Sequence, residues 1–280
     1  MGDLDGRTVL ITGASTGIGR ATAAALAARG ATLILAGRSE ERTRAAIAQI
    51  AAATGSDRLS FVGLDLGDLS SVRACAQTVL AGDRPLHVLI NNAGLAGRRG
   101  LTADGFELAF GTNHVGPFLL TALLLDRLRA GAPSRIVNVA SDAHYGAGGI
   151  DFAAVRRSTR SLTGMREYGV SKLANVLHAQ ELARRLQGTG VTTYALHPGV
   201  VASDIWRRVP WPVRPLMTRR MISPEQGAHT SVYCATSPEL ASESGGYYAD
   251  CRRKPPGAAA TPELAAELWE RTAAWTGAPQ

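Results

Sequence analysis

The sequence predicts an α/β protein in which a parallel sheet is covered by helices on both faces. Short apolar, β-branched runs alternate along the chain with longer helix-forming segments, the pattern of buried parallel strands joined by crossover helices. A glycine-rich turn joins the first such run to the first helix. The 280 residues contain no linker, repeat or low-complexity boundary, so we expect residues 1–280 to form a single domain.

Seven segments carry the strand pattern: residues 8–11, 32–36, 59–64, 87–90, 135–140, 192–196 and 246–250. Helices are expected at residues 21–28, after Ser39, and at residues 70–81, 105–130, 168–186 and 261–275. Ser223 to Gln226 form a capping box, which begins a further helix. The last helix is expected to pack over the sheet or against a partner subunit, so a homodimer or homotetramer is an open expectation.

Composition narrows the class of protein. The net charge of +7 comes almost wholly from arginine, because only Lys172 and Lys254 are lysines. The arginine pairs are scattered and lack interleaved aromatics, which favours a solvated surface and an anionic cofactor over nucleic acid.

The N-terminus lacks signal-peptide features, and the longest strongly apolar run, residues 118–125, is shorter than the roughly 20 residues of a membrane span. Three cysteines without metal-ligand spacing predict no metal site and a reducing cytoplasm.

The turn after the first strand has the spacing Gly-x-x-x-Gly-x-Gly, at residues 13–19. Glycines there allow a sharp turn and a close approach of a pyrophosphate to main-chain N–H groups, and the helix N-terminus adds partial positive charge. The turn alone is not specific, since any tight strand-to-helix turn favours glycine. We expect it to bind a dinucleotide through Gly13, Ser15, Thr16, Gly17, Ile18 and Gly19.

Further along the chain, Tyr168 and Lys172 have the spacing i, i+4 and therefore project from one face of one helix. A free tyrosine titrates near pH ~10, and an adjacent ammonium favours the phenolate, so we expect Lys172 to lower the pKa of Tyr168. The pair follows Ser141, which ends the fifth strand. Together these residues predict acid/base chemistry on a substrate oxygen.

These motifs, with Asn91-Asn92-Ala93-Gly94 and Asn113 in TNHVGPF, resemble the short-chain dehydrogenase/reductase family over essentially the whole chain. Residues 142–167 together with YGVSKLANVL resemble its retinol-dehydrogenase-like branch. The resemblance implies a single Rossmann-type, doubly wound domain with a seven-stranded parallel sheet of order 3-2-1-4-5-6-7. It also implies an enzyme that interconverts a carbonyl and an alcohol of a small molecule by hydride transfer.

The same resemblance implies roles for individual residues. Ser141 would hydrogen-bond the substrate oxygen, Tyr168 would give or take its proton, and Lys172 would also hold the nicotinamide ribose. Asn113 would distort its helix and hold a water that relays protons to Lys172. The other expected cofactor contacts are Asp65, Leu66, Asn91, Ala93, Gly94, Pro198, Gly199, Val201 and Ser203, the last replacing the usual threonine of the family.

Cofactor type depends on the end of the second strand. NAD enzymes place an acid there against the ribose 2′-hydroxyl, whereas this chain has Arg38. Arg38 predicts NADP(H), with NAD(H) left open as a second cofactor and a plain solvent-facing arginine as the alternative.

Residues 204–222 are rich in tryptophan, methionine, proline and arginine, and we expect them to form a substrate lid, with core packing as the alternative. His144 lies close to Ser141 in sequence, but it matches a loop residue of the branch and is expected to be structural.

A non-catalytic dinucleotide-sensing regulator is the alternative function, because fold does not imply function. Such regulators typically lack the Tyr or the Lys of the site, whereas this chain has both Tyr168 and Lys172. The sequence does not identify the substrate.

Overall fold

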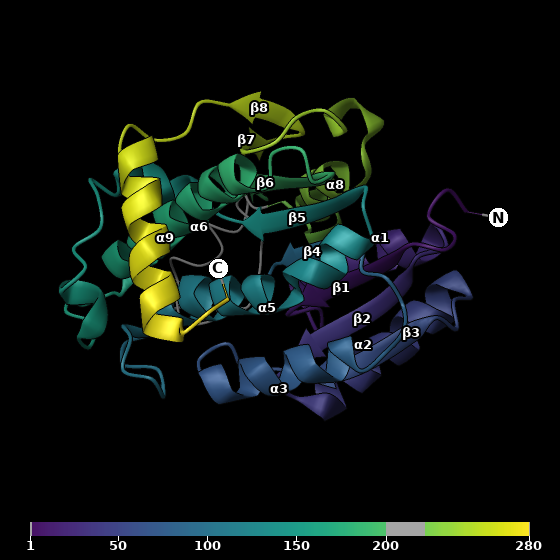
Figure 1. Cartoon of the computed structure of the whole chain (residues 1–280). Coiled ribbons are helices and arrows are strands. Elements are labelled where there is room, and N and C mark those ends of the chain that lie inside the picture. Colours follow the sequence, from purple (N-terminus) through teal and green to yellow (C-terminus); the bar gives the residue numbers. More distant parts are fainter. Residues whose placement is uncertain (1, 200–221, 280) are drawn as a thin grey trace.

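The computed structural model describes residues 2–199 and 222–279. Within them lies one eight-stranded sheet of order β3-β2-β1-β4-β5-β6-β7-β8, with β3 and β8 at its two edges (Figure 1). The strands are β1 (Thr8–Thr12), β2 (Thr32–Gly37), β3 (Leu59–Gly63), β4 (Val88–Asn91), β5 (Ser134–Val139), β6 (Val191–His197), β7 (Gly246–Ala249) and β8 (Arg252–Lys254). The first seven are parallel and follow the predicted order.

The eighth strand corrects the prediction of a seven-stranded sheet. β8 pairs antiparallel with β7, and Ala249 lies opposite Arg252. Asp250 and Cys251 between them both have positive φ, at 51° and 56°, as a two-residue hairpin turn of type I′ requires. No Gly or Asn marks this turn, and all three residues of β8 are exposed and polar, so the sequence carries no strand signal there.

Helices cover both faces of the sheet. The helices are α1 (Gly17–Ala28), α2 (Glu40–Thr54), α3 (Leu69–Leu80), α4 (Leu108–Phe110), α5 (Gly116–Ala130), α6 (Met165–Arg185), α8 (Pro224–Thr236) and α9 (Pro262–Thr276). One apolar core joins α1, α2 and α8 to the sheet, and a second joins α3, α5, α6 and α9 to its other face. The last helix, α9, lies across α6 and also contacts α5 of its own chain (Figure 1). It therefore lies over helices that cover the sheet, and packing against a partner subunit stays a prediction.

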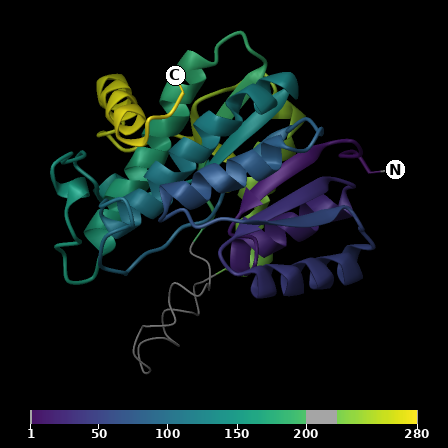
Figure 2. The ribbon, with the colours of Figure 1, turned by 60° about the horizontal axis from the view of Figure 1, so that its bottom comes forward.

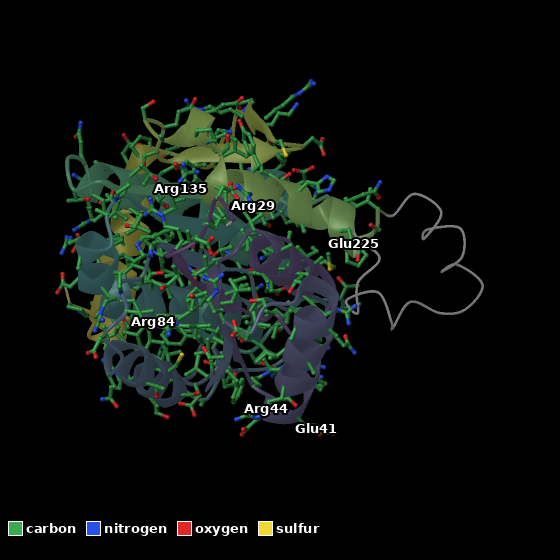
Figure 3. The ribbon with its side chains drawn as sticks, turned by 90° about the vertical axis from the view of Figure 1, so that its right-hand side faces the viewer. Arg29, Glu41, Arg44, Arg84, Arg135 and Glu225 are labelled. Carbon is green, nitrogen blue, oxygen red and sulfur yellow. The ribbon has the colours of Figure 1, made fainter. Side chains whose placement is uncertain are left out.

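The predicted helix ends are largely confirmed. Ser39 caps α2 through the backbone N–H of Arg42, and the capping box at Ser223 and Gln226 begins α8. At its other end α8 is held by two guanidinium groups, because Arg29 donates to Thr236 and Arg135 donates to the carbonyls of Cys234 and Ser237 (Figure 3). Positive charge at a helix C-terminus is favourable.

The predicted helix over residues 105–130 is interrupted. α4 is followed by a π-helical turn, η1 (Gly111–Val115), which leads into α5. By length and composition the stretch Leu108–Ala130 could cross a membrane, because an 18-residue window within it has a mean hydropathy of 1.4. Of that window 72% is buried inside the protein, and a helix packed inside a protein core needs the same apolar composition.

Candidate active site

The predicted site residues gather where the strands end. The glycine turn follows β1, Asn91 ends β4, Ser141 follows β5, and Pro198 follows β6. Carboxyl ends of parallel strands meet at one edge of the sheet, which is where open α/β sheets bind ligands. The long connection from β5 to α6 lies on the side away from the N-terminus (Figure 2).

The glycine turn and the NNAG segment form one hydrogen-bonded unit. Thr12 Oγ1 accepts hydrogen bonds from the backbone N–H groups of Asn92 and Ala93, each at 3.0 Å. The Asn92 side chain donates to the carbonyls of Thr12 and Gly13, at 2.8 and 3.2 Å. Sequence reasoning did not select Thr12 or Asn92, although both lie inside the motifs that it identified.

The glycines of the turn have distinct structural reasons. Gly13 has φ +70°, and a Cβ there would lie 2.8 Å from Ala93. A Cβ on Gly19 would lie 2.4 Å from the carbonyl oxygen of Gly13. Gly17 has φ +55° with nothing within 4 Å of an added Cβ, and the N-cap residue Thr16 makes no side-chain hydrogen bond to the first turn of α1. This open helix N-terminus fits the pyrophosphate of a dinucleotide.

The predicted adenosine contacts are only partly available. Asn91 is buried, and its amide donates to Thr121 Oγ1 at 3.0 Å and to Asn138 Oδ1 at 2.9 Å, which leaves its main chain for the predicted ribose contact. Leu66 is 4% exposed and belongs to the core, so it also offers only main-chain atoms. Asp65 Oδ1 accepts the N–H of Gly67 at 2.9 Å.

Arg38 directly follows β2 and is exposed. Among the residues that the structure describes, no acidic side chain pairs with it.

Lys172 and Tyr168 occupy one face of α6, as predicted, with Lys172 Nζ 5.6 Å from the centroid of the Tyr168 ring. Lys172 is 4% exposed and donates to the carbonyl of Val139 at 2.7 Å. Burial lowers the pKa of Lys172 to about 8, so the ammonium form still dominates at pH 7.

The pKa of Tyr168 departs from the prediction. Burial raises the pKa of its hydroxyl, and a hydrogen bond with Ser141 opposes part of that rise. The expected lowering by Lys172 is wrong for the protein alone, because loss of solvation on burial is the largest effect and only the interaction with Ser141 opposes it. The Ser141 and Tyr168 side chains therefore lie close enough to interact, and the Ser141 hydroxyl also accepts the N–H of Ala143 at 3.2 Å.

Asn113 lies inside the π-helical turn, which agrees with the helix distortion that the family resemblance implied. Its side chain accepts from the N–H of Leu95 at 2.8 Å and donates to the Leu95 carbonyl and to Ser171 Oγ, each at 2.9 Å. Ser171 Oγ in turn donates to the Tyr168 carbonyl at 2.7 Å. A Cβ on Gly94 would lie 3.2 Å from Asn113 Oδ1 and 3.4 Å from Lys172 Nζ, so Gly94 keeps open the space in front of both groups.

His144 is fully buried beside the site. Its Nδ1 lies 2.7 Å from the carbonyl of Ser141, and its Nε2 accepts the N–H of Gly257 at 3.0 Å. Because backbone groups occupy both ring nitrogens, the geometry agrees with the predicted structural role.

The nicotinamide end of the predicted site is described only in part. Pro198 and Gly199 follow β6, and a Cβ on Gly199 would lie 2.4 Å from Ile222. Val201, Ser203 and the predicted lid up to residue 221 lie outside the described residues. Over residues 2–199 and 222–279, no group of three or more His, Cys, Asp or Glu side chains is arranged to hold a metal.

Fold and site together define a dinucleotide-dependent oxidoreductase. Residues 7–211 match the family described as short chain dehydrogenase, and the chain belongs to the short-chain dehydrogenase/reductase family. Its cofactor is therefore a nicotinamide dinucleotide, NAD(P)(H).

Known proteins confirm the predicted branch. The chain is 45% identical to human dehydrogenase/reductase SDR family member 13, over 96% of this chain and 73% of that protein. It is 46% identical to mouse retinol dehydrogenase 12, over 89% of this chain and 79% of that protein. A crystal structure of an uncharacterised protein from Mycobacterium paratuberculosis is 34% identical and superposes with a TM-score of 0.77, covering all of this chain and 97% of the other.

Proposed function

We propose that this protein is an NADP(H)-dependent enzyme that interconverts a carbonyl and an alcohol on a small hydrophobic substrate. The observation that carries the proposal is the meeting of the Ser141 and Tyr168 hydroxyls beside buried Lys172. Similarity to retinol dehydrogenases supports a hydrophobic alcohol or aldehyde, and retinoids are the first substrates to test.

A dinucleotide stretched along the sheet edge fits three features of the structure. These are the open N-terminus of α1, the end of β2 at Arg38 and the space in front of Lys172. When bound, the nicotinamide supplies or accepts the hydride. Ser141 orients the substrate oxygen by a hydrogen bond, and Tyr168 donates a proton to that oxygen in reduction or removes it in oxidation. Lys172 provides positive charge beside the Tyr168 oxygen, and the π-helical turn around Asn113 supports the path by which the proton is replaced.

Arg38 supports the choice of NADP(H). A guanidinium forms strong, bidentate hydrogen bonds to phosphate, and the 2′-phosphate is the group that distinguishes NADP(H) from NAD(H). Arg38 stands where the acid of NAD enzymes would otherwise repel that phosphate.

The test is a screen of retinal, steroid ketones and aliphatic ketones that follows NADPH absorbance, with Tyr168→Phe as the paired variant. The phenylalanine keeps the ring and removes the proton donor. General acid catalysis contributes about 10²–10⁴-fold, so turnover should fall by about that factor while NADPH still binds. Turnover close to wild type in Tyr168→Phe would refute the proposed role.

Two further parts of the proposal rest on sequence. We propose that residues 204–222 cover the substrate, which hydrogen exchange tests through a rise in protection when cofactor and substrate are added. We also propose a cytoplasmic location, supported by the free thiols of Cys75, Cys234 and Cys251.

A further inference from the structure

The ladder between β5 and β6 ends at Val139 and Leu196, and just beyond it Asp142 and His197 connect the two chain segments. The last main-chain link is the Ala140 N–H to the Leu196 carbonyl at 2.7 Å. Beyond it, the Asp142 N–H donates to His197 Nδ1 at 3.3 Å, and His197 Nε2 lies 3.5 Å from Asp142 Oδ2. These contacts fix the tautomer of His197. Its Nδ1 accepts a hydrogen bond, so the ring proton is on Nε2.

Tyr247 of β7 completes the connection. Its hydroxyl donates to Asp142 Oδ1 at 2.7 Å, and Tyr247 itself is 2% exposed. The ring packs against His144, with centroids 4.6 Å apart, and His144 contacts the Ser141 carbonyl. The Asp142 carboxylate is thus held from β6 and β7 together, whereas its side chain is otherwise 55% exposed.

This arrangement affects two parts of the candidate site: the Ser141 hydroxyl and the predicted nicotinamide loop that begins at Pro198. Asp142 directly follows Ser141, which hydrogen-bonds Tyr168. His197 directly precedes Pro198 and Gly199, at the start of the predicted nicotinamide loop. A displacement of Asp142 would therefore move the Ser141 hydroxyl relative to Tyr168, and small misplacements of reacting groups are costly in rate.

We propose that Asp142 is a positioning residue, which Tyr247 and His197 hold so that the Ser141 hydroxyl stays in register with Tyr168. The inference rests on the proposed function and adds to it a residue that acts through Ser141. Because Tyr247 acts through Asp142, removing the Tyr247 hydroxyl or the Asp142 carboxylate should have the same consequence.

The experiment is a double-mutant cycle on kcat for carbonyl reduction, with Asp142→Ala, Tyr247→Phe and the double variant. Each single change should lower kcat about tenfold, which corresponds to about 1.4 kcal/mol, and should leave the KM for NADPH within about twofold. The double variant should be no slower than the slower single variant, since residues that act as a unit are not additive. Asp142→Asn, which keeps an acceptor for the Tyr247 hydroxyl, should retain most of the wild-type rate.

Tyr194→Phe is the matched control. Tyr194 is a fully buried tyrosine on the neighbouring strand, and its hydroxyl donates to the Leu240 carbonyl at 2.7 Å. It should keep wild-type kcat. An equal loss in Tyr194→Phe would show that the effect is general destabilisation, and wild-type kcat in Asp142→Ala or multiplying losses in the double variant would overturn the inference.

A second readout does not depend on turnover. A crystal structure of Asp142→Ala should show Ser141 Oγ displaced from Tyr168, and an unmoved Ser141 would overturn the inference. The two proposals also fail differently. Full turnover in Tyr168→Phe refutes the proposed function, whereas an inactive Tyr168→Phe beside a fully active Asp142→Ala refutes only the role of Asp142.

Discussion

The buried His178 should make the fold sensitive to acid below about pH 6.5. It lies on α6 and faces α5 and α9, with its ring centroid 5.1 Å from Phe118, 5.7 Å from His114 and 5.9 Å from Trp269. Its Nε2 has no hydrogen-bond partner among the described residues. Burial lowers the pKa of His178 to about 3, so the folded state keeps the ring neutral.

The sign and size of the effect follow from this difference in pKa. An unfolded histidine binds a proton below its ordinary pKa of about 6.5, while the folded protein does not until the pH approaches 3. The stabilisation is therefore complete above pH 6.5 and is lost progressively as the pH falls toward 3. The loss is about 1.4 kcal/mol per pH unit, which amounts to about 2 kcal/mol at pH 5 for this one residue.

Urea unfolding at pH 7.5 and pH 5.0 measures this loss. His178→Phe keeps an aromatic ring among its aromatic neighbours and removes the titrating group. Between the two pH values, its free energy of unfolding should fall by about 2 kcal/mol less than that of the wild type. His229→Gln, a change at an exposed histidine of α8, should follow the wild type. A pH dependence in His178→Phe equal to that of the wild type would refute the reasoning.

Three other predictions concern the site. Arg38→Asp should reverse the cofactor preference from NADPH to NADH in kcat/KM, and a wild type that already uses NADH as well as NADPH would refute the role of Arg38. The rate of carbonyl reduction should fall as the pH rises through about 8, because the pKa of Lys172 is lowered to about 8 and its ammonium is lost above that value; a flat profile to pH 9.5 would contradict this. Gly13→Ala should lower the free energy of unfolding by more than about 1 kcal/mol, since φ is positive and Ala93 is too close. The control Gly63→Ala, with nothing within 4 Å of the added Cβ, should change it by less.

The seven parallel strands were predictable because each carries a run of apolar, β-branched or aromatic residues, even the edge strand β3, which is only partly buried. β8 was not, since its residues Arg252–Lys254 face solvent and its position depends on pairing with β7. The packing of α9 on α5 and α6 could not be predicted from the residues of α9 alone. Trp269 settles that packing through contacts with Phe118 and Arg185 from distant parts of the chain.

Residue types in the site were easier to predict than their physical state. The i, i+4 spacing placed Tyr168 and Lys172 on one face of α6, as the structure shows. The direction of the Tyr168 pKa depends on how much solvent the fold removes from its hydroxyl, which no local pattern records. Asn91 shows the same limit, because its side chain is turned inward by Thr121 and Asn138, 30 and 47 residues away.

Thr12 and Asn92 explain why two separate sequence motifs form a single site. Thr12 ends β1 and is 0% exposed, so its hydroxyl has no water to bond and instead accepts two N–H groups of the segment that follows β4. Asn92 returns two hydrogen bonds to the carbonyls of the glycine turn. The contact is tight enough that Gly13 tolerates no Cβ. The requirement for glycine at position 13 therefore arises from Ala93, 80 residues later in the chain, as much as from the turn, and a substitution in either motif must displace the other.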